Sequence, residues 1–124
     1  MTTTTKQEIC EKLKSQVVQL IRDLMSILPN EENKLMMVFL FFQTCDSQNI
    51  MDEFKKWVHP WKVQISDRDM KFFFENDHVF GPLPSKQLEY MRQKLRDGTI
   101  DDENIDILWD YFDVFVKLMD RYDS

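Results

Sequence analysis

Three aspartates near the C-terminus come closest to the spacing of a chemical site. Asp106, Asp110 and Asp113 recur at intervals of four and three residues, which places their carboxylates on adjacent turns of one helical face. Paired carboxylates can hold a divalent cation or act as general acid and base. The large apolar residues fall on the opposite side, so we expect these carboxylates to be solvated. Alternatively, this acidic face attracts a basic protein partner by charge steering.

Other residues capable of catalysis or metal binding are few and scattered. His59 and His78 are the only histidines, and neither has a cysteine or second histidine at the spacing of a zinc site. His78 lies in the acidic segment 75–78, which could coordinate a metal, although a solvated loop is the simpler interpretation. Gly81 and Gly98 are the only glycines, too few for a phosphate-binding loop. We therefore predict no catalytic residue, no metal, no cofactor and no small-molecule substrate.

Cys10 and Cys45 are the only cysteines. If the first two helices form an antiparallel hairpin, Cys10 faces a position about one turn away from Cys45, and such pairs often miss the Cα separation that a disulfide needs. We expect two buried free thiols. The N-terminal sequence shows no secretory signal pattern, so a reducing, intracellular compartment is the expectation.

The segment 55–62 combines lysines with two tryptophans. Bases could stack on Trp57 or Trp61 while the lysines contact phosphates. One short basic stretch neutralises few phosphates, however, and Trp57 lies in phase with Phe54 and Ile50, as a core residue would. The net charge of −6 also disfavours nucleic acid and anionic membranes. We therefore expect this segment to pack within the protein.

The composition is that of one globular domain spanning residues 1–124, with residues 1–4 as a tail. Of its 124 residues, 43% are hydrophobic, and only two Gly and four Pro are available for turns, which favours helices joined by short loops. The longest apolar run, Leu35 to Phe42, is too short to span a membrane. The sequence predicts an all-α bundle of about five long helices plus one short helix.

Capping residues and apolar spacing predict where the first three helices lie. Thr5 and Glu8 form a capping box that begins a first helix, and Pro29 ends it. A second helix, at about 31–45, contains the longest apolar run, and we expect it to be a central helix covered on every side. A third covers 47–58.

The second half of the chain is predicted to hold the remaining helices. The segment Ser66-Asp67-Arg68-Asp69 resembles a helix start, so a short helix is expected there. After the break at 81–84, Ser85 caps a helix that Gly98 ends in the left-handed conformation. The last helix then opens at 99–103.

The last helix carries the unusual charge and apolar pattern of the chain. Residues 99–124 hold eight acidic and two basic residues, while residues 1–98 hold fourteen of each sign. Its apolar arc spans roughly 220°, where a helix resting on one core needs only about 100°. The extra width comes from an apolar seam formed by Ile107, Tyr111, Val114 and Leu118. This spacing suits docking against another helix, although a central helix of the bundle also needs two buried sides.

Four short motifs follow one another from about residue 20 onward. They are Ile27-Leu28-Pro29, Asp69-x-x-x-Phe73-Phe74, Asp77-x-x-Phe80-x-x-Leu83-Pro84 and Asn104-x-x-x-Leu108-Trp109-x-Tyr111-Phe112. In this order they resemble a class of small helical proteins encoded by nucleocytoplasmic large DNA viruses. The resemblance implies a viral origin and a helical fold. Each motif is a packing or turn element, so the resemblance implies no catalytic role.

Together these observations favour a non-enzymatic interaction or assembly protein, such as a viral adaptor or a minor virion component. The predicted partner is another protein or a second copy, bound by the apolar seam and by Asp106, Asp110 and Asp113. The alternative is an acidic regulatory protein that binds a basic host or viral partner, and nucleic-acid binding ranks below both. If the origin is viral, the host cytoplasm, the nucleus or the virion is the expected location.

Overall fold

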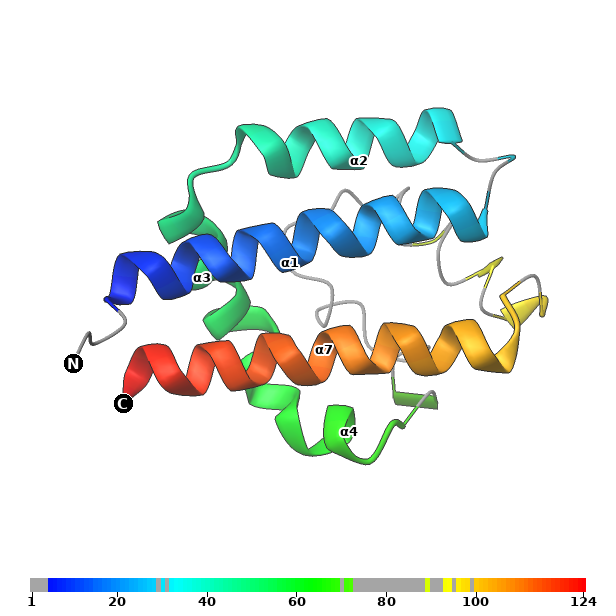
Figure 1. Ribbon diagram of the computed structural model, residues 1–124. Helices are drawn as coiled ribbons and strands as arrows, with labels where there is room; N and C mark the ends of the chain where they lie inside the picture. The colour runs from blue at the N-terminus through cyan, green and yellow to red at the C-terminus, as the bar shows by residue number, and fades with distance from the viewer. Residues whose placement is uncertain are drawn as a thin grey trace.

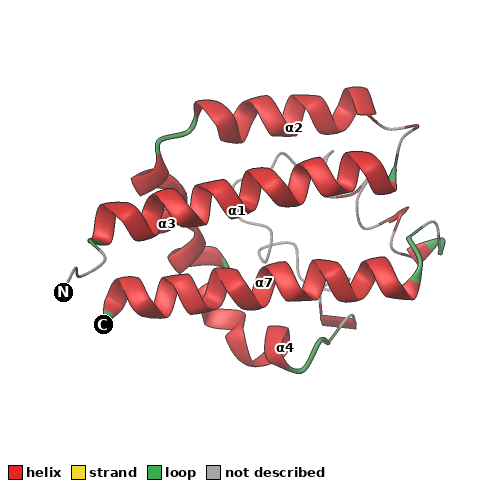
Figure 2. Ribbon diagram, in the orientation of Figure 1, coloured by secondary structure: helices red, strands yellow, loops and turns green. Residues whose placement is uncertain are grey.

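The computed structural model describes residues 5–28, 30, 32–69, 71–72, 89, 93–94, 96–98 and 100–124. The α-helices in this part of the chain are α1 (Lys6–Ile27), α2 (Glu32–Thr44), α3 (Ser47–Trp57), α4 (Lys62–Ser66) and α7 (Asp102–Asp123). A 3₁₀ turn, η2 (His59–Trp61), joins α3 to α4. Every labelled element is helical (Figures 1 and 2), which confirms the all-α class. The helix predicted after Ser85 falls mostly outside the described residues.

Helix α1 is the central element of the described fold. It lies between α2 and α7 and runs antiparallel to both, while α3 crosses behind and α4 lies beyond α7 (Figure 1). Helix α1 contacts α2, α3 and α7, whereas the extensive contacts of α2 are with α1 alone among the described helices. The start of α1 and the end of α7 lie at the same end of the molecule.

Local capping interactions set the helix ends, as the sequence predicts. The Glu8 backbone N–H donates to the Thr5 hydroxyl at 3.1 Å, which begins α1. The Asn104 backbone N–H donates to the Asp101 carboxylate at 2.9 Å, which begins α7. Gly98 has φ +77°, the left-handed conformation expected of a glycine at a helix end.

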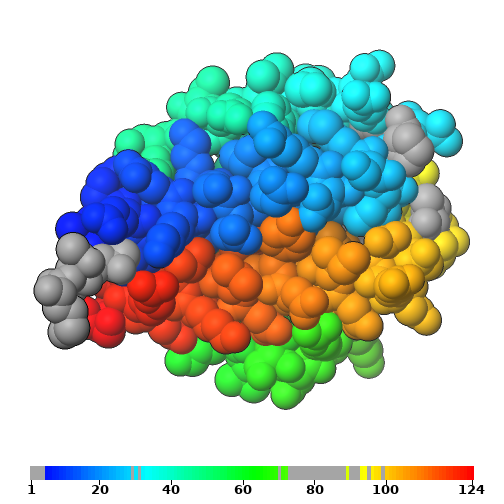
Figure 3. All heavy atoms as spheres, viewed as in Figure 1, coloured from blue at the N-terminus to red at the C-terminus, as the bar shows by residue number. Residues whose placement is uncertain are grey.

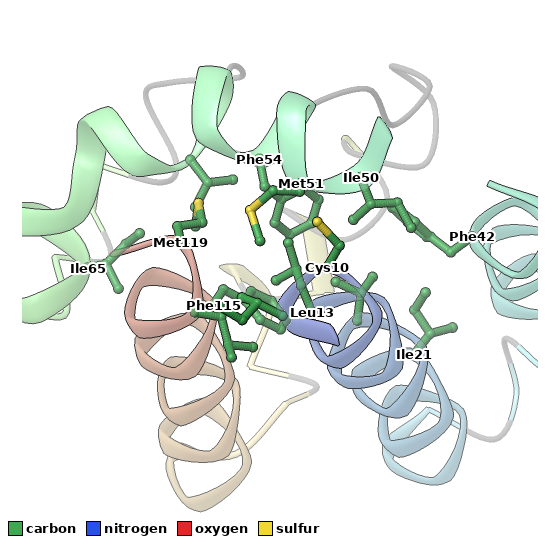
Figure 4. Packing of buried hydrophobic residues seen from close by; sticks show 14 of the residues in the cluster. Cys10, Leu13, Ile21, Phe42, Ile50, Met51, Phe54, Ile65, Phe115 and Met119 are labelled. Atoms are coloured by element: carbon green, nitrogen blue, oxygen red, sulfur yellow. The ribbon is translucent and has the colours of Figure 1, made fainter. Parts of the chain in front are cut away.

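One continuous core connects α1, α2, α3, α4 and α7 (Figure 4). Cys10 and Leu13 of α1 meet Met51 of α3 and Phe115 of α7, and all four are completely or almost completely buried. Helices α1 and α3 contribute positions spaced mostly three or four residues apart, so one apolar stripe of each faces this core, while α4 contributes Ile65. A smaller cluster near the other end of α1 contains Leu24, Leu28, Leu35 and Ile100.

The prediction that the apolar second helix is covered on every side is wrong. Only Leu35, Val38 and Phe42 of α2 are buried, while Met37 is 63% and Leu40 54% exposed. The reason is position: α2 forms an outer layer with α1 on one side, and in the space-filling view it is at the upper edge (Figure 3). Apolar residues all around a helix favour its burial, but burial on a second side also requires a second packed element, which the composition of the helix does not determine.

Candidate functional site

The acidic face of α7 is paired with an arginine of the same chain. Arg68, just after α4, reaches Asp110 at 2.7 Å and both Asp106 and Asp113 at 3.4 Å. The hydrogen bond to Asp110 and the charges of the three aspartates raise the pKa of the Arg68 guanidinium. The Asp106 and Asp110 side chains are still about 70% exposed, consistent with the predicted solvated stripe (72% and 68%). The three aspartates therefore already hold a basic group.

The backbone at the end of α4 places this arginine. Arg68 has φ 54°, its N–H donates to the Ile65 carbonyl, and the next N–H, of Asp69, donates to the Gln64 carbonyl. These two bonds form a Schellman helix end, in which the left-handed position is usually glycine. Of the helix start predicted at 66–69, the first residue is misplaced, because Ser66 ends α4, whereas Asp69 accepts the Phe72 N–H at 3.1 Å, as a helix cap does.

The remainder of the acidic stripe meets the basic segment 55–62. His59 Nε2 lies 2.6 Å from Asp120, and the Lys55 ammonium lies 2.5 Å from Asp123. The hydrogen bond to Asp123 raises the pKa of Lys55. Two basic groups of the only basic, aromatic stretch are therefore engaged by α7. This pairing supports the expectation that the segment packs within the protein.

The tryptophans of this segment also have contacts inside the chain. Trp57 donates its indole N–H to Glu53 at 2.7 Å, and the Trp61 ring lies 4.7 Å from the Phe72 ring. A nucleic acid would have to compete with these contacts to stack on either ring.

The predicted apolar seam of α7 is divided between the interior and the surface. Leu118 is buried, and the Tyr111 hydroxyl donates to the Asp23 carboxylate of α1. Burial, followed by the hydrogen bond and charge of Asp23, raises the pKa of Tyr111 to about 12. Ile107 and Val114 are 38% and 37% exposed. The seam thus contributes to the contact with α1, and a separate partner for it stays a prediction.

Among the described residues, four of the seven exposed large hydrophobic side chains lie on α2, where sequence reasoning did not place them. We call this group the α2 face, and it comprises Met36, Met37, Leu40 and Phe41, with exposed fractions of 39%, 63%, 54% and 39%. On a helical projection these positions cluster within about 140°, opposite the buried residues. The clue in the sequence was the apolar run itself, which was longer than one buried stripe requires.

An open pocket of about 310 Å³ adjoins this face at the C-terminal end of α2. Phe41 belongs both to the α2 face and to the pocket wall. The lining residues are Phe41, Phe42, Cys45, Asn49, Ile50, Glu53 and Phe54. Apolar rings with a few polar groups at the edge form a surface that can hold an apolar side chain.

The two thiols are free, as predicted. Cys10 is buried and its thiol lies 3.6 Å from the Gln48 side-chain oxygen, while Cys45 is only half-buried. Burial raises the pKa of both thiols, which disfavours the nucleophilic thiolate. Among the described residues, no three His, Cys, Asp or Glu side chains cluster as metal ligands. His78 lies outside the described residues.

Comparisons with models of known protein families, with curated proteins and with solved structures give no match. The resemblance to viral helical proteins therefore stays a prediction. No helix in the described part of the chain has both the length and the apolar character needed to cross a bilayer.

Proposed function

We propose that this chain is a non-enzymatic protein-interaction domain and that the α2 face is its docking surface. The observation that carries this proposal is the exposure of four neighbouring large apolar side chains on one helix. Surfaces of this kind mark interaction sites, because their burial against a partner removes apolar area from water. Methionine and aromatic residues are also enriched at protein interfaces.

The geometry of the α2 face favours a helical partner. The four exposed residues of the α2 face are one, three or four positions apart, so their side chains form an apolar strip along the helix axis. Such a strip suits docking against another helix. The adjoining pocket can accept one anchoring side chain beside Phe41. In the pocket, Cys45 has a raised pKa and no histidine is among the described lining residues, so its chemistry favours binding over catalysis.

The acidic regulatory role is the second candidate. It is favoured by the three aspartates of α7 that surround the Arg68 guanidinium, an arrangement complementary to a basic group. A basic partner would have to displace Arg68, whereas a partner of α2 displaces only water. For this reason we rank the α2 face first, with an adaptor or assembly role, in a virion if the origin is viral.

Site-specific photo-crosslinking tests the docking surface. Benzoylphenylalanine replaces Met37 or Leu40, and in a matched control it replaces Lys117, an exposed residue of α7. The purified chain is irradiated alone and in an extract of its native source. We expect covalent adducts at positions 37 and 40, absent at 117, and lost from position 37 when Leu40→Glu is added. If adduct yields at 37 and 40 do not exceed those at 117 in either setting, the proposal is wrong.

A further inference from the structure

We infer that the occupant of the α2 face is a second copy of this chain, docked with the two α2 helices antiparallel across a twofold axis. This inference rests on the proposed function and names its partner. The axis passes between positions 38 and 39, so residues whose numbers sum to 77 lie opposite one another.

The α2 face is self-complementary about this axis. Met37 of one copy lies opposite Leu40 of the other, and Met36 lies opposite Phe41, so flexible methionines pack against stiffer side chains. The exposed Asn33 and Thr44 extend the line by one turn at either end. Positions 33, 37, 40 and 44 follow the i, i+4, i+7, i+11 spacing of a helix–helix seam. Two copies therefore bury one apolar centre flanked by uncharged polar residues.

Charge at the two ends of α2 selects the antiparallel arrangement. Glu32 lies in the first turn of α2, while at the other end the Lys14 ammonium donates to the Gln43 and Cys45 carbonyls at 3.0 and 2.7 Å. In the antiparallel pair the start of each α2 lies beside the end of its partner's α2, so the helix dipoles oppose one another. A parallel pair would bring like ends together.

The exposed area indicates a weak dimer. If a fully exposed large side chain presents roughly 200 Å², the four residues supply about 400 Å² per copy. A total of about 800 Å² from these side chains is below the roughly 1,000 Å² of a specific interface, so the polar residues around them must supply the rest. We therefore expect a dissociation constant between about 10 and 500 μM, measurable as concentration-dependent association.

Sedimentation equilibrium of the purified chain, from about 5 μM to 1 mM, tests the inference at the concentrations that this affinity requires. The wild type should pass from monomer to dimer across this range. Leu40→Glu should weaken association at least tenfold. The matched control Lys117→Glu should leave it unchanged. Circular dichroism of each variant confirms that the helices are intact.

Disulfide crosslinking tests the register. In a Cys45→Ser background, Met37→Cys and Leu40→Cys chains are mixed and oxidised. The mixture should give a crosslinked heterodimer in clear excess over either variant alone, because positions 37 and 40 face each other. Equal yields in all three reactions would contradict the antiparallel register.

The outcomes also separate this inference from the proposed function. A chain that stays monomeric at every concentration, or a dimer unaffected by Leu40→Glu, overturns the second-copy inference. If photo-adducts to another protein still form at positions 37 and 40, the proposed function stands without it. If there is neither a dimer nor an adduct, both are wrong.

Discussion

The hydrogen bond between Tyr111 and Asp23 joins α7 to α1, and its removal should destabilise that contact. The apolar pattern of α7 predicts either a separate partner or a second buried side for Tyr111; in the structure its hydroxyl donates to the Asp23 carboxylate, and its ring packs against the main core. Tyr111→Phe removes the hydroxyl and leaves the ring. The Asp23 carboxylate keeps the Gln19 amide as a donor at 3.0 Å, so the variant does not leave it without a partner.

The expected loss at neutral pH is about 1–2 kcal/mol in the free energy of unfolding. A hydrogen bond to a charged group contributes about 1.5–3 kcal/mol, and the lower part of that range applies because both side chains are partly exposed to water.

The loss should also depend on pH. The pKa of Tyr111 rises from its ordinary value of 10.0 to about 12 in the folded chain, because of burial and the Asp23 hydrogen bond and charge. Below pH 10 both states keep the phenol proton, so the contribution to stability is complete. Between pH 10 and 12 the unfolded chain loses this proton first, so the free energy of unfolding falls by up to about 2–3 kcal/mol, or about half that after solvent screening.

Urea unfolding followed by circular dichroism, at pH 8 and pH 11.5, measures both effects. The wild type should lose more stability than Tyr111→Phe between the two pH values, and Tyr111 should titrate late by ultraviolet absorbance. As a control, Asp23→Asn keeps an acceptor but removes the charge, so it should lower the pKa of Tyr111. Equal unfolding midpoints for wild type and Tyr111→Phe at both pH values would refute the reasoning and leave Tyr111 available to an external partner.

Two further predictions concern the helix end at Arg68 and the thiols. Arg68→Ala and Arg68→Gly both remove the ion pairs, but only glycine adopts the left-handed conformation without steric strain. The alanine variant should therefore unfold at a lower urea concentration than the glycine variant. The opposite order would exclude the Schellman assignment. Alkylation of the native chain at pH 7, measured by mass spectrometry, should be faster at half-buried Cys45 than at buried Cys10. Both thiols should react more slowly than a cysteine in a peptide, because both pKa values are raised. Equal rates for the two thiols would contradict the burial of Cys10.

Helix ends were predictable from the sequence because capping is a local interaction. Thr5 with Glu8, the left-handed Gly98, and Asp101 at the start of α7 all occur within a few residues of the groups they satisfy. The free state of the cysteines was equally accessible, since it followed from the geometry of one hairpin.

The partners of the α7 aspartates were not predictable in the same way. Arg68 and Asp110 are 42 residues apart, and their contact depends on how α4 ends and where it lies beside α7. The charge pattern indicated that the acidic face needs a positive partner, but it could not tell a partner in the same chain from another protein. Arg68 also occupies a position that is usually glycine, so the local pattern gave no indication of its role.

Helices α2 and α7 differ in how much of their apolar surface the rest of the chain covers. Both have more apolar surface than one neighbour can cover. Helix α7 has α1 on one side and α3 and α4 on another, so much of its apolar surface is buried within the chain, while Ile107 and Val114 remain exposed. Helix α2 has extensive contacts with α1 alone among the described helices, so Met37 and Leu40 remain in water. A second α2 would supply the missing neighbour and give α2 packed elements on two sides, as α7 already has.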